Sequence, residues 1–355
     1  MFPIIFQLLN GSIDLPKERN NIRYEELLGQ ILMNRVGGIV YERIAKCSDI
    51  AFPKNFCRSL EAVYLMNVAE NEWYYTGVRY LTKVLSKADF KYAFLKGAVL
   101  IPSLYRKGQR ISNDIDILVH ANSLTQCQNL LKENGFVQGH YNWQTKQVRK
   151  ADRREIIMAK MNFGETIPFY KEIDGKILCV DINFSVDFKP GDPRIIEILL
   201  DSVCEVSIGD ISLKTLAHKY FFIHLCCHLY KEATTFDWVK TNRDLSLYKF
   251  YDIYLFVNKY FDKSFIGQVI NCIKELGMEK ECYYTMKNTI VIFPEMENSD
   301  VREFLAAICP DNLDFMHQIF IPSEKISYVY EQSFTEWFLT PNRGEIIERW
   351  IKERV

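Results

Sequence analysis

Residues 95–120 read LKGAVLIPSLYRKGQRISNDIDILVH and place two acidic side chains inside an apolar strand pattern. Aspartate is a poor strand former, and a carboxylate that is buried without a partner carries a large desolvation cost. Asp114 and Asp116 lie two positions apart, so on a strand both side chains project from the same face. Ile115 and Ile117 would then fill the opposite face. The pattern therefore predicts two neighbouring carboxylates with a common function.

A later stretch of alternating polar and apolar residues supplies a third acidic side chain. Residues 176–188 read KILCVDINFSVDF, and Asp181 lies on the polar face together with Asp187. If this strand lies beside Asp114 and Asp116, three carboxylates meet and repel one another. A hard divalent cation with oxygen ligands, Mg²⁺ or Mn²⁺, relieves that repulsion. Two such ions about 3.5–4 Å apart can activate an attacking oxygen and stabilise a leaving one.

The start of the opening stretch has the features of a phosphate-binding turn. A predicted strand over residues 91–96 runs into Gly97 and Ala98, and a helix follows. Glycine lets the backbone approach a ligand closely, and the free N–H groups at a helix start attract phosphate. Lys96 adds a positive charge beside this turn. Strand-to-helix turns also use glycine for geometry alone, but together with the carboxylates the turn indicates nucleotide chemistry.

In this order the motifs resemble the polymerase-β-like nucleotidyltransferase superfamily. More closely, they resemble the bacterial family of uncharacterised nucleotidyltransferases, with its LKG-A…Y…R…DIDLLV signature and a third motif that commonly reads VDLHW. The likeness is dense over residues 91–188 and extends loosely over about two-thirds of the chain. It implies that Asp114, Asp116 and Asp181 are metal ligands, and that Asp181 also helps to deprotonate an acceptor hydroxyl.

The resemblance also assigns the phosphate contacts. Gly97 and Ala98 match the phosphate-contacting turn, Lys96 matches its basic neighbour, and Arg110 matches an arginine that would contact the triphosphate. Two positions depart from the pattern. Ala98 stands where many superfamily members have serine, so backbone N–H groups would have to hold the phosphate. Asn183 stands where the close family often has histidine, so any acid–base role there would be lost or moved.

The remaining chain predicts helical layers on both sides of this core. Residues 22–46 and 55–87 have apolar residues at helical spacing, residues 141–172 favour one or two hairpins, and the chain turns helical again from about Ser212. The predicted fold class is α/β (α+β), a minimal nucleotidyltransferase core with a mixed β-sheet. The predicted domains are a helical N-terminal region (1–88), the α/β core (89–211) and a helical C-terminal domain (212–355).

Composition and charge limit the partners. The chain has 44 basic and 45 acidic side chains, so its balance does not indicate a protein that coats nucleic acid or a membrane surface. We therefore expect an NTP and a hydroxyl acceptor on a small molecule, peptide or protein. The basic residues 146–154 could hold a phosphate, but a solvated face is the simpler explanation. The ten cysteines are scattered, which favours reduced thiols in the cytoplasm, and no apolar run is long enough to span a membrane.

A second set of polar residues lies in an apolar helical stretch. His224 and His228 have the i, i+4 spacing of a zinc pair, but no HExxH motif accompanies them, so core histidines are the favoured interpretation. Glu232 follows His228 by four residues and would share its helix face. The two could contact the acceptor or form an internal ion pair, and the sequence leaves both open.

We therefore expect Mg²⁺-dependent transfer of a nucleoside monophosphate from ATP or another NTP to a hydroxyl group, with release of pyrophosphate. Catalysis would rest on positioning and on metal electrostatics. Two alternatives remain. The protein could be a non-catalytic nucleotide- or peptide-binding partner, although all three aspartates are present. It could also be a toxin-like nucleotidyltransferase controlled by a partner, and inactivation at Asp116 would then relieve harm on expression.

Overall fold

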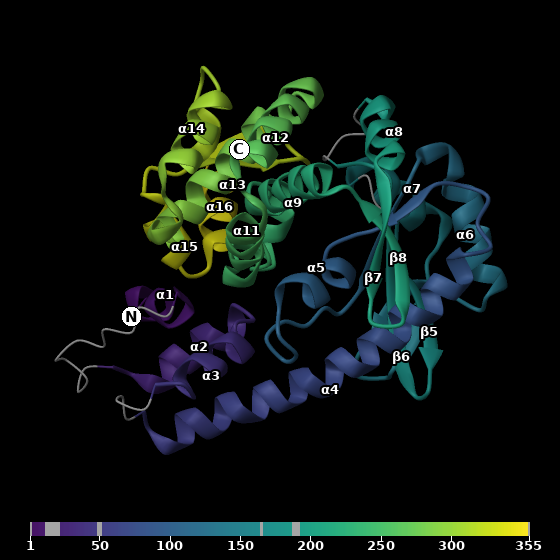
Figure 1. Ribbon diagram of the computed structural model, residues 1–355, viewed down its shortest axis with the longest axis horizontal. Helices are drawn as coiled ribbons and strands as arrows, with labels where there is room; N and C mark the ends of the chain where they lie inside the picture. The colour runs from purple at the N-terminus through teal and green to yellow at the C-terminus, as the bar shows by residue number, and fades with distance from the viewer. Residues whose placement is uncertain (1, 11–21, 48–51, 164–165, 187–191, 354–355) are drawn as a thin grey trace. The chain divides into compact units, whose positions relative to one another are not determined.

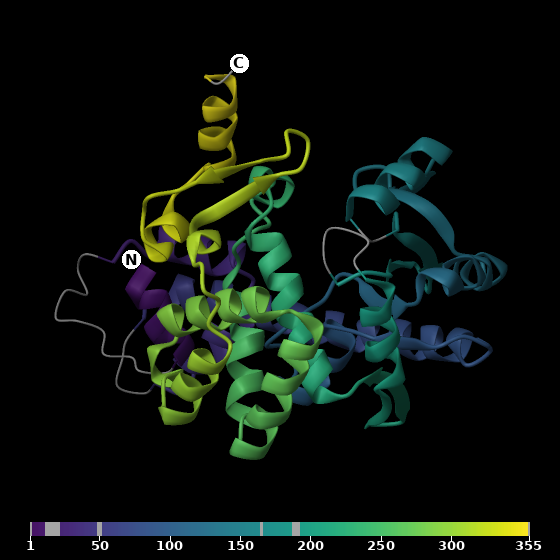
Figure 2. The ribbon, with the colours of Figure 1, turned by 90° about the horizontal axis from the view of Figure 1, so that it is seen from above.

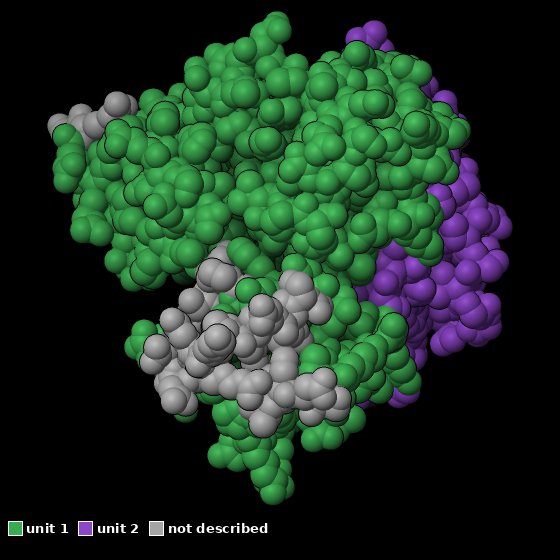
Figure 3. Space-filling model, turned by 60° about the vertical axis from the view of Figure 1, so that its left-hand side comes forward, with its two compact units in different colours: residues 1–68, 106–110, 226–355 green, residues 69–105, 111–225 purple. Residues whose placement is uncertain are grey.

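The computed structural model describes residues 2–10, 22–47, 52–163, 166–186 and 192–353 (Figure 1). The chain forms two compact units, and each is assembled from separate stretches of sequence (Figure 3). Unit 1 comprises residues 1–68, 106–110 and 226–355, and unit 2 comprises residues 69–105 and 111–225. The five residues 106–110 thus belong to unit 1 although both flanking stretches belong to unit 2.

Unit 2 is built on an eight-stranded mixed sheet. Its strands are β1 (Tyr92–Phe94), β2 (Ile115–Val119), β3 (Val137–Asn142), β4 (Gln147–Lys150), β5 (Phe169–Ile173), β6 (Lys176–Asn183), β7 (Val203–Ile208) and β8 (Ile211–Leu216). The strand order is β4-β3-β5-β6-β2-β1-β8-β7. β2 pairs with β6 and β1 pairs with β8 in parallel, and the other neighbours are antiparallel. The predicted α/β class with a mixed sheet is therefore confirmed.

Helices cover this sheet and set which side chains stay accessible. They are α5 (Gly97–Leu104), α6 (Leu124–Glu133), α7 (Arg153–Phe163), α8 (Pro193–Asp201), the second half of α4 (Lys54–Leu85) and the start of α9 (His218–Ala233). α4 packs so closely on β6 that a Cβ at Gly77 would lie 2.5 Å from Leu178 Cδ1. Leu178 is buried beneath α4. Because side chains alternate along a strand, Cys179 and Asp181 project from the opposite face.

Two elements of unit 2 differ from the sequence-based expectation. Residues 137–150 form one expected hairpin, β3–β4, and β5 begins a second with β6, but the segment between them is helix α7. The sequence of α7 begins RREIIMAK, and its apolar residues do not repeat clearly at helical spacing. Its hydrophobic periodicity therefore does not predict a helix. The C-terminal helices begin at His218 rather than near Ser212, because residues 211–216 form β8 beside β1.

Unit 1 is mainly helical. It contains α1 (Phe2–Asn10), α2 (Tyr24–Met33), α3 (Gly37–Ile44), the first half of α4, the end of α9, α10 (Phe236–Lys240), α11 (Leu247–Tyr260), α12 (Lys263–Leu276), α13 (Glu279–Ile292), α14 (Ser299–Ala307), α15 (Phe334–Leu339) and α16 (Arg343–Lys352). A small hairpin, β9 (Gln318–Ile321) and β10 (Ile326–Val329), lies beside α16, where Tyr328 contacts Trp350 (Figure 2). No helix in the described parts of the chain is long and apolar enough to cross a membrane.

Buried ion pairs and close backbone packing hold unit 1 together. Arg343 donates to both carboxylate oxygens of Asp244, at 3.0 and 2.9 Å. The segment 106–110 packs against α3, where a Cβ at Gly38 would lie 1.9 Å from the Gly108 carbonyl oxygen. Asn67 Nδ2 donates to that same oxygen at 3.0 Å. Residues 106–110 are therefore a firmly packed part of unit 1.

Candidate active site

Strands β2 and β6 bring together acidic side chains that are far apart in sequence. The two strands are parallel neighbours, and Asp116 is in register with Asp181. Neighbouring strands lie about 4.8 Å apart, and residues paired in register project from the same face of the sheet. Asp114 directly precedes β2, and its Oδ1 accepts a hydrogen bond from Ser112 Oγ at 3.2 Å. The structure thus places the three predicted carboxylates in one region of unit 2.

Two uncharged side chains respond to the negative charge of this cluster. Burial raises the pKa of the Cys179 thiol well above its usual value, and the charges of Asp181, Asp114 and Asp116 raise it further. Burial also raises the pKa of Tyr74, again with contributions from Asp114 and Asp116. Its hydroxyl donates to the Asp114 carbonyl oxygen at 3.1 Å. A region of such negative potential favours a bound cation.

Asp116 is the most deeply placed of the three and already has two partners. It is 2% exposed, and its Oδ1 accepts from Lys96 Nζ at 2.7 Å and from Asn183 Nδ2 at 3.3 Å. Asn183, where histidine was expected from the resemblance, therefore orients Asp116 through its amide. The oxygen donors match the ligands that Mg²⁺ prefers. In the described residues, however, no group of three or more His, Cys, Asp or Glu side chains is already arranged around a metal position.

The predicted phosphate-binding turn has an unusual backbone at Lys96. This residue has φ 43° and ψ −119°, close to the mirror image of the second residue of a type II turn, a conformation normally taken by glycine. Such a conformation costs on the order of 1–3 kcal/mol in other residues and occurs mostly at functional sites. The amides of Val99 and Leu100 donate to the Lys96 carbonyl oxygen, and α5 begins at Gly97. The strained turn thus sets the direction in which α5 begins.

Gly97 is required by packing at this point. A Cβ there would lie 2.6 Å from both Cβ and Oγ of Ser112 and 3.1 Å from the Tyr74 hydroxyl. Ser112 in turn holds Asp114. The glycine therefore lets the turn lie directly against the residues that support the acidic strand. Gly97 and Ala98 occupy the first turn of α5, where backbone N–H groups have no acceptor within a helix.

The structure places Arg110 in unit 1, whereas the carboxylates belong to unit 2. Its guanidinium donates to both oxygens of Asp252 at 3.0 Å, and its centre lies 4.4 Å from the ring centroid of Tyr248. The Arg110 side chain is only 7% exposed. Its contact with a triphosphate stays a prediction, and its observed contacts anchor the segment that precedes the acidic strand.

The histidine and glutamate of α9 lie in contact with each other, which is one of the two arrangements that the sequence left open. His228 Nε2 lies 3.3 Å from Glu232 Oε2, and Lys249 Nζ lies 2.6 Å from the same oxygen. Lys249 is itself buried and donates to the Arg243 carbonyl oxygen at 2.6 Å. These side chains therefore belong to the polar interior of unit 1. Asp187, which the sequence places on the same polar strand face as Asp181, lies outside the described residues.

Sequence reasoning missed several residues that shape the site. Ser112 could have been found, because it lies two positions before Asp114 and repeats the spacing of the acidic pair. Cys179 stands in the same relation to Asp181. Tyr74 gave no such signal, since it comes from α4 and reaches the site only through tertiary packing.

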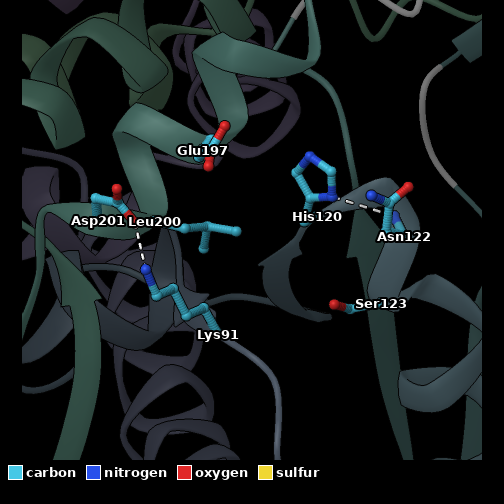
Figure 4. Close-up of a pocket in the computed structure, with 7 residues that line it drawn as sticks. All are labelled: Lys91, His120, Asn122, Ser123, Glu197, Leu200 and Asp201. Atoms are coloured by element: carbon cyan, nitrogen blue, oxygen red, sulfur yellow. Dashed lines mark hydrogen bonds and ion pairs between the residues drawn. The ribbon is translucent and has the colours of Figure 1, made fainter.

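A separate polar pocket of about 320 Å³ lies at the other end of β2 (Figure 4). One side of the pocket is lined by residues that follow β2: His120, Asn122 and Ser123. The other side is lined by Glu197 and Asp201 of α8 and by Lys91, which precedes β1. Lys91 pairs with Asp201, and His120 Nδ1 accepts from the Asn122 amide at 3.2 Å. Because Asp114 precedes β2 and His120 follows it, this pocket is distinct from the carboxylate region.

Comparisons with known proteins give one structural neighbour and one family. The solved structure described as an antigenic nucleotidyltransferase-like protein from Paracoccidioides brasiliensis is 15% identical, with a TM-score of 0.38, over 65% of this chain and 91% of that chain. No curated protein matches the chain. A family model described as uncharacterised nucleotidyltransferase matches residues 20–294, which is more than half of the chain. The chain therefore belongs to the family of uncharacterised nucleotidyltransferases.

Proposed function

We propose that this protein transfers a nucleoside monophosphate from ATP or another NTP to a hydroxyl acceptor and releases pyrophosphate. Family membership supports nucleotidyl transfer in general. The register of Asp116 with Asp181, with Asp114 just before β2, is the observation that carries the specific proposal. Three carboxylates this close together repel one another, and the Lys96 ammonium that pairs with Asp116 supplies a single positive charge among them, so a bound metal cation would stabilise the group.

Each residue has a role that follows from its place. Asp114, Asp116 and Asp181 would hold Mg²⁺ or Mn²⁺, which when bound supplies positive charge to the triphosphate and lowers the pKa of an oxygen that it contacts. The Gly97 and Ala98 amides, at the start of α5, would bind phosphate oxygens. The Lys96 ammonium, which pairs with Asp116 in the structure, can equally pair with a phosphate.

Asp181 is best placed to handle the acceptor. It is only partly buried and comes from a different strand than Asp114 and Asp116, so it can contact an acceptor hydroxyl while the other two hold the metal. Its carboxylate would orient that hydroxyl and accept its proton. The remaining rate enhancement would come from holding the two substrates in line.

The cysteines support a proposal about the cellular setting. All ten lie in described parts of the chain and are free thiols, and several are buried. Free thiols persist in reducing compartments. We therefore extend the proposal to a cytoplasmic enzyme.

A thermal-shift experiment tests the metal and nucleotide site. Mg²⁺ or Mn²⁺ with an NTP should raise the melting temperature of the wild type, because a ligand that binds only the folded state stabilises it. The double variant Asp114→Asn with Asp116→Asn should lose that shift. The matched control, Asp89→Asn with Asp174→Asn, removes two exposed carboxylates of unit 2 and should keep it. An equal shift in the first variant would remove the metal-site claim.

A transfer assay then separates an enzyme from a binding protein. The protein is incubated with each α-labelled NTP, the metal and host extract, and labelled products are separated by size and class. Label on an acceptor, absent with the Asp114→Asn and Asp116→Asn variant, supports transfer. A thermal shift without any labelled acceptor would instead favour the nucleotide-binding partner protein.

A further inference from the structure

The β3–β4 hairpin of unit 2 extends past the sheet as a two-stranded ribbon. β3 pairs with β5 only at Val137 and Gln138, whereas Gly139 through Asn142 pair with β4. We call residues 139–150 the β3–β4 ribbon. Its turn is well held, since Asn142 Oδ1 accepts from the amides of the next turn residues at 2.8 and 3.0 Å. The ribbon is therefore an ordered projection.

A series of aromatic rings leads from the carboxylates to the ribbon. Tyr170 of β5 is paired with Cys179 of β6, two residues before Asp181. Tyr170 and Cys179 therefore project from the same face of the sheet as Asp181, so the Tyr170 phenol lies close to this cluster. The Tyr170 ring stacks on Tyr141 with centroids 5.9 Å apart, and Tyr141 packs against Trp143 at 4.8 Å.

Trp143, at the end of this series, is unusually exposed. Its 78% exposure exceeds that of every other large apolar side chain in the described residues. Tryptophan is normally buried over much of its surface, so a ring left open at a ribbon tip is typical of a contact surface. The other two rings are half-buried.

The ribbon that carries the exposed ring also carries positive charge. Four cationic side chains are exposed on and directly after the ribbon, and within the described residues none of them has an ion pair or side-chain hydrogen bond: Lys146, Lys150, Arg153 and Arg154. Arg149 differs, because Glu155 pairs with it at 2.6 and 3.1 Å. The ribbon thus combines open aromatic faces with positive charges that have no internal partner.

We propose that the β3–β4 ribbon binds a single-stranded polynucleotide whose terminal hydroxyl is the acceptor for nucleotidyl transfer. This inference rests on the proposed function and names its acceptor class. Rings in series with flanking cations match the alternation of bases and phosphates in a single strand, in which every base offers a face for stacking. An acidic peptide would use the cations and leave the rings without a role. A duplex hides its base faces within the stack.

The dimensions and the charge both allow this acceptor. β3 is two strands from β6, about 10 Å across the sheet, so the ring series starts beside Asp181 and leads away from it. The net charge of −1 describes the whole chain and does not exclude a local basic surface. The sequence-based preference for a small molecule, peptide or protein acceptor rested on that overall balance.

The transfer is balanced without any further reactant. The terminal hydroxyl oxygen forms a bond to the α-phosphorus of the NTP, and the bond from that phosphorus to the oxygen bridging to the β-phosphate breaks. Pyrophosphate leaves with that bond's electron pair. The hydroxyl proton passes to Asp181, and the polynucleotide becomes longer by one nucleotide.

Binding is tested with the full chain and a short fluorescent single-stranded RNA, without NTP or metal. Trp143→Ala should weaken binding roughly tenfold, the effect expected for loss of one stacked base, whereas Trp143→Phe should retain most of the affinity. Lys146→Glu with Lys150→Glu should also weaken it and make the negative slope of log K against log salt shallower by about 1.4. The matched control reverses two exposed lysines of α4 and the turn after it, Lys83→Glu with Lys87→Glu, and should bind as the wild type.

Three results would overturn the inference. One is equal affinity in Trp143→Ala and the wild type, and another is an equal loss in the Lys83 and Lys87 control. The third is competition by polyaspartate or by anionic lipid vesicles as effective as that by RNA of the same charge, which would identify an acidic protein or a membrane surface instead.

A second measurement keeps this inference separate from the proposed function. The Asp114→Asn and Asp116→Asn variant should bind RNA normally and transfer nothing to it. If RNA binding depends on Trp143 but the wild type transfers no nucleotide to RNA, the ribbon is a binding surface for RNA, and the claim that RNA is the acceptor is wrong. Transfer to another acceptor at the same rate in Trp143→Ala would leave the function standing and overturn the inference.

Discussion

Replacing Lys96 by glycine and by alanine should separate backbone strain from charge at the predicted phosphate-binding turn. Both variants remove the ammonium that pairs with Asp116 at 2.7 Å. Only glycine adopts φ 43° and ψ −119° without strain. The difference in stability between the two variants therefore reports the backbone, because the lost ion pair is common to both.

The expected difference follows from two opposing effects. Strain in a residue with a side chain costs about 1–3 kcal/mol in such a conformation. Glycine loses more conformational freedom on folding than alanine, which costs about 0.4–1 kcal/mol. We expect Lys96→Gly to be more stable than Lys96→Ala by roughly 1–2 kcal/mol. Both should be less stable than the wild type, which keeps the ion pair between Lys96 and Asp116. In either variant the buried Asp116 carboxylate, 2% exposed, would retain mainly its hydrogen bond from the Asn183 amide.

Urea unfolding monitored by circular dichroism measures this difference, with the two variants compared under identical conditions. Nucleotide binding should be weakened equally in both, because neither carries the Lys96 ammonium. If Lys96→Ala proved as stable as Lys96→Gly, the turn would be relaxed and the strain interpretation wrong. If only the alanine variant lost nucleotide binding, the backbone conformation at Lys96, rather than its charge, would be what nucleotide binding requires.

Three further predictions address other parts of the molecule. Asp181→Asn should keep most NTP binding and lose on the order of 10²-fold or more in turnover; turnover like that of the wild type would show that the third carboxylate is misassigned. Asp252→Asn leaves the buried Arg110 guanidinium without its carboxylate and should cost about 3–5 kcal/mol in urea unfolding, whereas Arg110→Met with Asp252→Leu should cost much less; equal losses would refute this. Hydrogen bonds from Arg149 lower the pKa of Glu155 from 4.5 to about 2, so their stabilisation is complete above pH 4.5 and disappears as the pH falls towards 2. The melting temperature should therefore fall more steeply across this range in the wild type than in Glu155→Gln, and identical profiles would contradict the assignment.

The sequence by itself determined the local parts of the site. Side chains two positions apart on a strand project from the same face, so the spacing of Asp114 and Asp116 was enough to place their carboxylates together. The strand–glycine–helix order likewise predicted the turn at Gly97, because few residues other than glycine tolerate close backbone packing. These inferences depend only on covalent geometry and on neighbours within a few positions.

Tertiary structure decided which distant residues meet. The register of Asp116 with Asp181 depends on β6 pairing with β2 and on the burial of Leu178 against α4. Arg110 donates to Asp252, 142 positions later in the chain, and no local pattern indicated that contact. Strand pairing and buried ion pairs minimise the free energy of the whole fold, and many alternative partners satisfy the same local pattern. Local spacing therefore fixed the direction of each side chain, and packing alone fixed its partner.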